Sequence, residues 1–257
     1  MKKSMVCAVV AAALVCMSLA SCSKKKTANQ CEMVKIPDRN FELMNTEVTQ
    51  KLYEEIMGEN PSYWDYNKGE NNPVTDVSWY DAIYFCNKMS EKYGYKPVYS
   101  VNGSTDVSKW GYAPHKNEEI KSRLKWNKNE NGFRLPTVDE WLFAAFAGQD
   151  FKFPGSNNAY EVGWFKENSG KKVHSLVLPV VHPVAKKKPN AFGFYDMAGN
   201  AEEWCWDPKY YSHTDETYRI ACGSNYMSNP DPMIWQREPW REVCSVGFRI
   251  ARTVIEN

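Results

Sequence analysis

Apolar residues recur with helical spacing in three segments of the chain. Thr49 is placed to cap a short helix that ends at Gly58. A longer apolar pattern follows Ser78 and runs to Gly94, which predicts a second helix. The run Thr137–Glu140 has the spacing of a capping box, so a third helix is predicted to begin there.

Short extended pieces lie between and after these helices, each bounded by Gly, Pro or Asn. The predicted strands are Phe41–Met44, Pro97–Val101, Phe192–Tyr195 and Gly247–Arg252. Two long stretches, 102–132 and 149–190, show no period. With no internal repeat and no Gly/Ser linker, the pattern predicts one α+β domain that is rich in irregular loops. Its 10 Trp and 15 Tyr residues predict a core built from large rings.

Composition then narrows the class of protein. The chain has 257 residues, 43% hydrophobic and 25% charged, which is an ordinary globular balance. Lysine and arginine total 32 against 31 acids, for a net charge of +1. This balance disfavours a nucleic-acid partner bound through bulk charge, and none is expected.

The N-terminus has the pattern of an export signal. A basic start precedes the apolar run Met5–Ala20, which is too short for a confident membrane span, and Leu-Ala-Ser-Cys ends at Cys22. This resembles a bacterial lipoprotein signal, which implies cleavage after residues 1–21 and a lipid anchor on Cys22. Residues 22–31 would form a tether and 32–257 the single domain. The alternative is an ordinary secretory signal with a chance cysteine.

Lipidation would place the protein outside the cytoplasmic membrane, in the outer membrane or at the cell surface. Disulfides persist there. Five cysteines remain once Cys22 carries lipid, and an odd number cannot all pair within one chain. They are Cys31, Cys86, Cys205, Cys222 and Cys244. One disulfide among the last three is plausible from their positions, and the pairing stays open.

Several sequence blocks carry a family resemblance. In chain order they are Asn45–Thr49, Asn60–Ser62, Pro73–Ala82, Gly132–Thr137, Glu140–Ala145, Pro189–Asn200, Glu203–Trp204 and Gly247–Arg252. Together they resemble the formylglycine-generating enzyme (sulfatase-modifying factor) family over roughly residues 32–252. The resemblance implies a C-type-lectin-like fold.

The chemistry of the family depends on residues that this chain lacks. Its enzymes oxidise a sulfatase cysteine to formylglycine with oxygen and copper, which two cysteine thiolates hold. The resemblance puts those thiolates shortly after Cys222–Ser224, at 227–228 and 232–233, where the chain has Met-Ser and Pro-Met. No catalytic residue and no copper are therefore expected. The alternative is a formylglycine-generating type of oxidoreductase that acts on protein cysteine.

A second property of the family is a structural calcium ion. The resemblance implies side-chain ligands at Asp196 and Glu203, with backbone carbonyls from Gly199 and Ala201. Hard oxygen donors of this kind suit calcium. The alternative is a plain Gly-Asn turn whose acids are merely solvated.

Segment 225–245 mixes large aromatics, arginine and short polar side chains, as recognition surfaces do. The predicted ligand-binding residues are Tyr226, Trp235, Gln236, Arg237 and Trp240. The arrangement is similar to variable proteins diversified by retroelements, several of them spirochaete lipoproteins, in which this last segment varies. A protein or glycan ligand is expected. The alternatives are that the rings belong to the core, or that the chain is a structural lipoprotein of the envelope.

The lipoprotein signal predicts acylation of the Cys22 thiol. A Cys22→Ala chain should lose fatty-acid labelling and leave the membrane fraction, because no thiol would remain at the attachment point. Metabolic labelling followed by fractionation measures both effects. Labelling that survives the substitution would refute the prediction.

Overall fold

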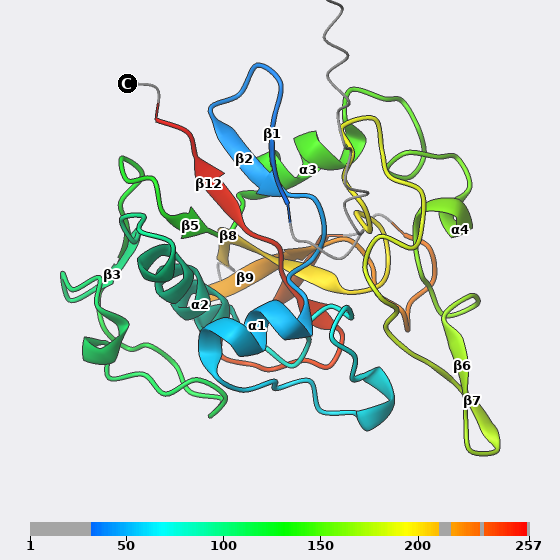
Figure 1. Cartoon of the computed structure of the whole chain (residues 1–257), viewed down its shortest axis with the longest axis horizontal. Helices are drawn as coiled ribbons and strands as arrows, with labels where there is room; N and C mark the ends of the chain where they lie inside the picture. Colours follow the sequence, from blue (N-terminus) through cyan, green and yellow to red (C-terminus); the bar gives the residue numbers. More distant parts are fainter. Residues whose placement is uncertain (1–31, 211–216, 232–233, 256–257) are drawn as a thin grey trace, which may run out of the picture.

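The computed structural model describes residues 32–210, 217–231 and 234–255. Its first sheet joins the two ends of the domain (Figure 1). The four strands, in the order β1-β2-β12-β5, are β1 (Met33–Lys35), β2 (Phe41–Met44), β12 (Ala251–Thr253) and β5 (Phe133–Arg134). All of their pairings are antiparallel. The last strand therefore closes the fold against the first two.

A second sheet carries the C-terminal half of the chain. In the order β10-β9-β8-β11, its strands are β10 (Ile234–Arg237), β9 (Thr217–Cys222), β8 (Glu202–Tyr210) and β11 (Val246–Gly247). The pairing of β11 with β8 is parallel, and the others are antiparallel. Two small hairpins complete the strands. They are β3 (Tyr99–Val101) with β4 (Leu124–Trp126), and β6 (Gly170–Val173) with β7 (Leu176–Pro179).

The helices are α1 (Gln50–Met57), α2 (Trp79–Lys92), α3 (Val138–Phe146) and the short α4 (Ala159–Val162), with 3-10 turns at Asp65–Asn67 and Val107–Lys109. The three predicted helices, α1 to α3, begin where the sequence predicts, and the short α4 and two 3-10 turns were not predicted. Thr49 caps α1, while Ser78 and Thr137 each form a full capping box. α2 packs against α1 and β5, and α3 against β8 and β9. Within the described residues, no helix is long and apolar enough to cross a membrane.

The two predicted C-terminal strands differ from the structure. Phe192–Tyr195 is a turn, because the Asn190 carboxamide accepts the amides of Phe192 and Phe194 at 3.0 and 3.1 Å, so they are not free for a ladder. Gly247–Arg252 is split between β11 and β12. Between them, the carbonyls of Phe248 and Ile250 accept single backbone bonds from Val48 and Met44. The sequence pattern did not predict β8, β9 or β10.

The core is built from large rings, as predicted. Trp79 and Trp204 are fully buried, and their indole N–H groups donate to Cys205 and Val77 carbonyls at 2.8 and 2.9 Å. Each ring thus ties the start of α2 to β8 by a hydrogen bond as well as by packing. Trp206 stacks on Tyr99 with 5.0 Å between ring centroids.

Two of the cysteines lie together. The Sγ atoms of Cys205 on β8 and Cys222 on β9 are 3.5 Å apart in the buried core, with both thiols free. Cys86 is buried in α2 and Cys244 is half-buried. Cys22 and Cys31 lie outside the described residues. Among the four cysteines that the structure describes, Cys205 and Cys222 are therefore placed to form a disulfide on oxidation.

Candidate functional site

Tyr226 is a structural residue. Its ring is 2% exposed, its hydroxyl accepts from Asn67 at 3.2 Å and donates to the Cys244 carbonyl at 3.3 Å. Its backbone amide also donates to the Asn200 carbonyl at 2.9 Å. The enclosed side chain and its two hydrogen bonds argue against a ligand contact at Tyr226, whose role in binding stays a prediction.

Strand β10 divides the next three predicted residues between its two faces. Gln236 is exposed, whereas Trp235 is half-buried and packs against the main core. The Arg237 guanidinium pairs with the buried Glu202 carboxylate at 2.7 Å, and Asn225 donates to the same carboxylate. Burial raises the pKa of Glu202 and Arg237 opposes that rise. Of these three residues, Gln236 alone is exposed.

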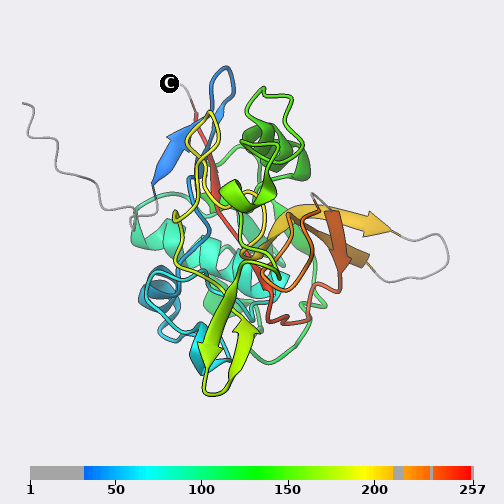
Figure 2. The same ribbon diagram turned by 90° about the vertical axis from the view of Figure 1, so that its right-hand side faces the viewer.

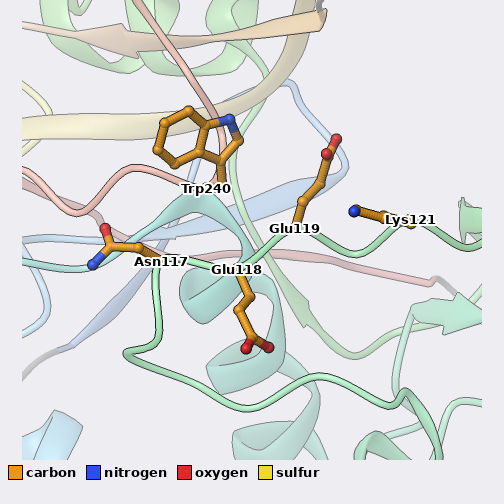
Figure 3. A pocket seen from close by; sticks show the side chains of 5 residues that line it. All are labelled: Asn117, Glu118, Glu119, Lys121 and Trp240. Carbon is orange, nitrogen blue, oxygen red and sulfur yellow. The ribbon is translucent and has the colours of Figure 1, made fainter.

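Trp240 is the exposed aromatic residue of segment 225–245. Its side chain is 40% exposed and lines a cavity of about 560 Å³. The other lining residues are Asn117, Glu118, Glu119 and Lys121. Figure 3 shows the Trp240 indole ring above the segment 117–121, with Glu119 and Lys121 on one side and Asn117 on the other. Residues 117–121 carry no signal in the sequence, because they lie inside a long stretch without hydrophobic periodicity.

Hydrogen bonds hold the two sides of the cavity together. The Asn117 backbone and side chain donate to the Glu242 carboxylate at 3.5 and 3.4 Å. The Glu242 backbone amide returns a bond to Asn117 Oδ1 at 3.2 Å. Below them, the Tyr80 hydroxyl donates to Glu119 at 3.5 Å. Residues more than a hundred positions apart in the chain thus form one surface.

The cavity combines one flat ring with acids, an amide and one lysine. An indole face accepts a sugar ring by stacking or a cation through its quadrupole. Carboxylates and amides in reach of the ring can satisfy hydroxyl or ammonium groups of the same ligand. The arrangement therefore suits a polar ligand with a ring or a cationic group.

The predicted calcium ligands lie in a buried charge cluster. Asp196 has a left-handed backbone with φ of 53°, and its Oδ2 accepts the Ala185 amide at 2.7 Å. Its Oδ1 is buried without a hydrogen-bond partner. The Glu203 carboxylate, by contrast, is paired with Arg249 through Oε2 and Oε1 at 2.5 and 2.6 Å. Trp141 also donates to Glu203 Oε2 at 2.7 Å.

Three buried carboxyl groups, those of Glu47, Asp196 and Glu203, interact with one buried guanidinium, that of Arg249. Burial raises the pKa of Asp196 to about 6 and raises that of Glu47 well above its usual range. Arg249 opposes both rises and pairs directly with Glu203. Both Glu203 oxygens are engaged with donors, so this residue does not fit calcium in the arrangement seen, whereas Asp196 Oδ1 would. Calcium binding stays a prediction.

The positions that hold copper in the resembling enzymes carry no thiol here. Met227 is 39% exposed, and Ser228 Oγ bonds within its own turn to the Asn225 carbonyl at 3.0 Å. Residues 232–233 lie outside the described residues. The thiols of Cys205 and Cys222 are enclosed in the core, and burial raises the pKa of Cys205 well above its usual range.

Known proteins resemble this chain over most of its length. The family model "Sulfatase-modifying factor enzyme 1-like domain" matches residues 11–254. "Chaperone protein LppX" of Paenibacillus barcinonensis is 39% identical over 204 residues, which cover 74% of this chain and 70% of that protein. Among solved structures, "Treponema denticola variable protein 1" is similar with a TM-score of 0.71 and 30% identity. That match covers 88% of this chain and 93% of the other.

A shorter match concerns a protein named as inactive. "Inactive C-alpha-formylglycine-generating enzyme 2" of Bos taurus is 32% identical over 108 residues, 39% of this chain. The matched part spans about a third of that relative's length, at 34%. These similarities confirm the expected C-type-lectin-like fold.

The Glu203–Arg249 pair predicts a large stability effect that does not depend on metal. Glu203→Gln should lower the free energy of unfolding by about 3–5 kcal/mol, because it leaves a buried guanidinium without its counter-charge. The control Glu42→Gln breaks the more exposed pair with Arg252, and should cost at most about 1 kcal/mol. Both are measured by denaturant unfolding, with and without a calcium chelator.

The chelator distinguishes an ion pair between Glu203 and Arg249 without metal from calcium binding by Glu203. If Glu203 only pairs with Arg249, the chelator leaves both variants and the parent chain unchanged. A chelator-dependent loss of stability in the parent that Glu203→Gln abolishes would instead establish calcium and contradict the ion-pair account.

Proposed function

Since the chain belongs to the sulfatase-modifying factor enzyme 1-like family, we propose that it uses the fold of that family for binding rather than oxidation. The protein is a lipid-anchored binding protein of the cell envelope. It recognises a protein or glycan through the cavity beneath Trp240. The main support is that the large ring of Trp240 is 40% exposed and lines a cavity of about 560 Å³.

The location of the cavity supports this proposal. Trp240 lies between β10 and β11, inside segment 225–245, for which composition and the resemblance to variable proteins both predict recognition. The inner part of the same segment is committed to the fold through Tyr226, Trp235 and Arg237. The recognition surface is therefore narrower than predicted, with Trp240 and Gln236 as its displayed members. Segment 117–121 supplies the other wall.

The similarity to a variable protein supports diversification of this surface by a retroelement. Under that proposal, codon variation would be concentrated at displayed positions such as Gln236 and Trp240 and absent at Tyr226, because variation there would break the fold. An imperfect repeat of the 3′ coding end, next to a reverse transcriptase gene, is the DNA signature to seek.

A chaperone role is a second candidate function, and a specific relative favours it. The name of the Paenibacillus barcinonensis relative describes it as a chaperone. In the present chain, Leu176 and Val177 are 62% and 72% exposed on the hairpin β6–β7, which projects from the body of the molecule (Figures 1 and 2). Exposed apolar side chains on a projecting element could contact an unfolded client. Suppression of client aggregation that requires these two residues, and not Trp240, would favour this candidate.

The binding proposal predicts that Trp240→Ala weakens ligand binding and leaves folding intact. An aromatic anchor at an interface commonly contributes about 2 kcal/mol or more, which corresponds to at least a thirtyfold weaker affinity. A matched control is Trp64→Ala, because Trp64 is 42% exposed and does not line the cavity. A glycan array and a panel of secreted proteins are probed with parent, variant and control, and affinities are then measured for each hit.

The melting temperature is measured in parallel with affinity. Trp240→Ala should melt within a few degrees of the parent, because its ring is displayed. A large drop in melting temperature, or binding that Trp64→Ala weakens equally, would contradict the assignment of this surface.

The absent thiolates predict that the chain does not make formylglycine. A peptide carrying the sulfatase cysteine motif is incubated with the protein, copper(I) and oxygen, and its mass is compared with a sample lacking protein. We expect no conversion, because positions 227–228 hold no copper ligand of thiolate type and no thiol is encoded at 232–233. Turnover above the blank would establish the oxidoreductase alternative.

A further inference from the structure

Three potential metal ligands meet beside, but not in, the cavity. They are Asp81 in the first turn of α2, His115 in the irregular stretch after β3, and Glu242 just before β11. His115 Nδ1 is 3.6 Å from Asp81 Oδ2 and 4.0 Å from Glu242 Oε1. One donor atom from each residue lies within 4.8 Å of the other two, and among the described residues this is the one such group of three found.

The histidine is held with one nitrogen directed into the group. Its Nε2 lies 3.1 Å from the Tyr53 hydroxyl, and its backbone amide donates to Asp81 Oδ1 at 3.2 Å. The side chain is 12% exposed, and Nδ1 is buried without a hydrogen-bond partner. If Nε2 carries the ring proton and donates it to Tyr53, the Nδ1 lone pair faces the two carboxylates. A ring nitrogen fixed by an outer hydrogen bond is the usual state of a metal-bound histidine.

The Asp81 carboxylate can bind a metal ion if the Ser78 hydroxyl donates its hydrogen bond to another acceptor. Its Oδ2 accepts the Ser78 amide and the Ser78 hydroxyl at 2.8 and 2.7 Å, and its Oδ1 accepts the Tyr112 hydroxyl at 2.7 Å. The Ser78 hydroxyl is also 3.1 Å from the Tyr112 oxygen. If Ser78 donates there instead, a lone pair of Asp81 Oδ2 is released and the capping amide bond stays.

We propose that Asp81, His115 and Glu242 bind one divalent ion of the zinc class, with solvent as the fourth ligand. Zinc accepts imidazole nitrogen and carboxylate oxygen at about 2.0–2.2 Å, which places tetrahedral ligands about 3.3–3.6 Å apart. The His115–Asp81 separation already has that value. The 4.0 Å distance between His115 Nδ1 and Glu242 Oε1 must shorten for both to bind the ion. The Glu242 side chain can make this movement because it is 19% exposed, whereas that of Asp81 is fully buried. Two carboxylates also balance the charge of the ion.

Binding would fix the geometry of one side of the cavity. His115 and Glu242 flank the reciprocal Asn117–Glu242 contact that joins its two walls. An ion on Glu242 would therefore order the segment that presents Trp240. The inference itself does not depend on the proposed function, because zinc binding is measured on the chain without any ligand.

The test is a zinc titration of the full chain, purified in detergent without a polyhistidine tag and stripped of metal. Zinc alone is added against a chromophoric chelator, and cobalt(II) absorption reports on tetrahedral coordination. We expect one equivalent to bind and to raise the melting temperature. Because loss of an outer-shell partner alone costs 10–100-fold in affinity, His115→Ala should weaken binding at least about 100-fold.

Three further variants complete the design. Glu242→Gln removes a ligand from a more exposed position, so it should weaken binding even if His115→Ala fails to fold. Glu167→Gln and His174→Ala alter exposed residues elsewhere and serve as matched controls with unchanged zinc affinity. Absence of stoichiometric binding by the parent, or equal affinity in parent and Glu242→Gln, would overturn the proposal.

Discussion

The buried pair between Glu203 and Arg249 is the constraint on which the rest of the structure depends. Arg249 lies between β11 and β12, and Glu203 lies on β8. The guanidinium also donates to the carbonyls of Met44 and Tyr195 at 3.1 and 3.0 Å. A charge without solvent is tolerated only when it is paired and fully hydrogen-bonded, so these contacts admit one arrangement of the two sheets.

Close backbone approach reinforces that arrangement. A Cβ atom at Gly247 would lie 2.3 Å from the Val74 carbonyl oxygen, so only glycine allows β11 to lie there. The same strand pairs with β8 next to Glu203. The chain between β10 and β11 is thus fixed at both ends. Within segment 225–245, Tyr226 is enclosed and Trp235 is half-buried, whereas Trp240 stays exposed.

The relatives of this chain carry names that describe different functions. One fold can support different functions because the residues that perform them lie at separate sites. One relative is named a chaperone, one an inactive enzyme and one a variable protein, and the present chain resembles all three. The variable protein has a similar fold, whereas chemistry depends on a few side chains in loops. Here the copper positions hold no thiolate in the sequence, while loops brought together from residues 115–121 and 240–242 carry polar and aromatic groups.

The sequence by itself determined the elements whose signals are local. Thr49, Ser78 and Thr137 mark the helix starts, because a cap acts on amides within three residues of itself. The ordered blocks of the family likewise determined the fold, through Gly247–Arg252 and the other motifs.

Only the tertiary structure decided which side chains are displayed. Tyr226 and Trp240 look alike in sequence, yet one is enclosed and the other exposed, because burial depends on which distant segment covers each ring. Glu203, a predicted calcium ligand, also pairs with Arg249, 46 positions away, which no local pattern indicates. The walls of the cavity and the Asp81–His115–Glu242 group arise the same way. Each joins residues separated by more than a hundred positions, a proximity that no local pattern encodes.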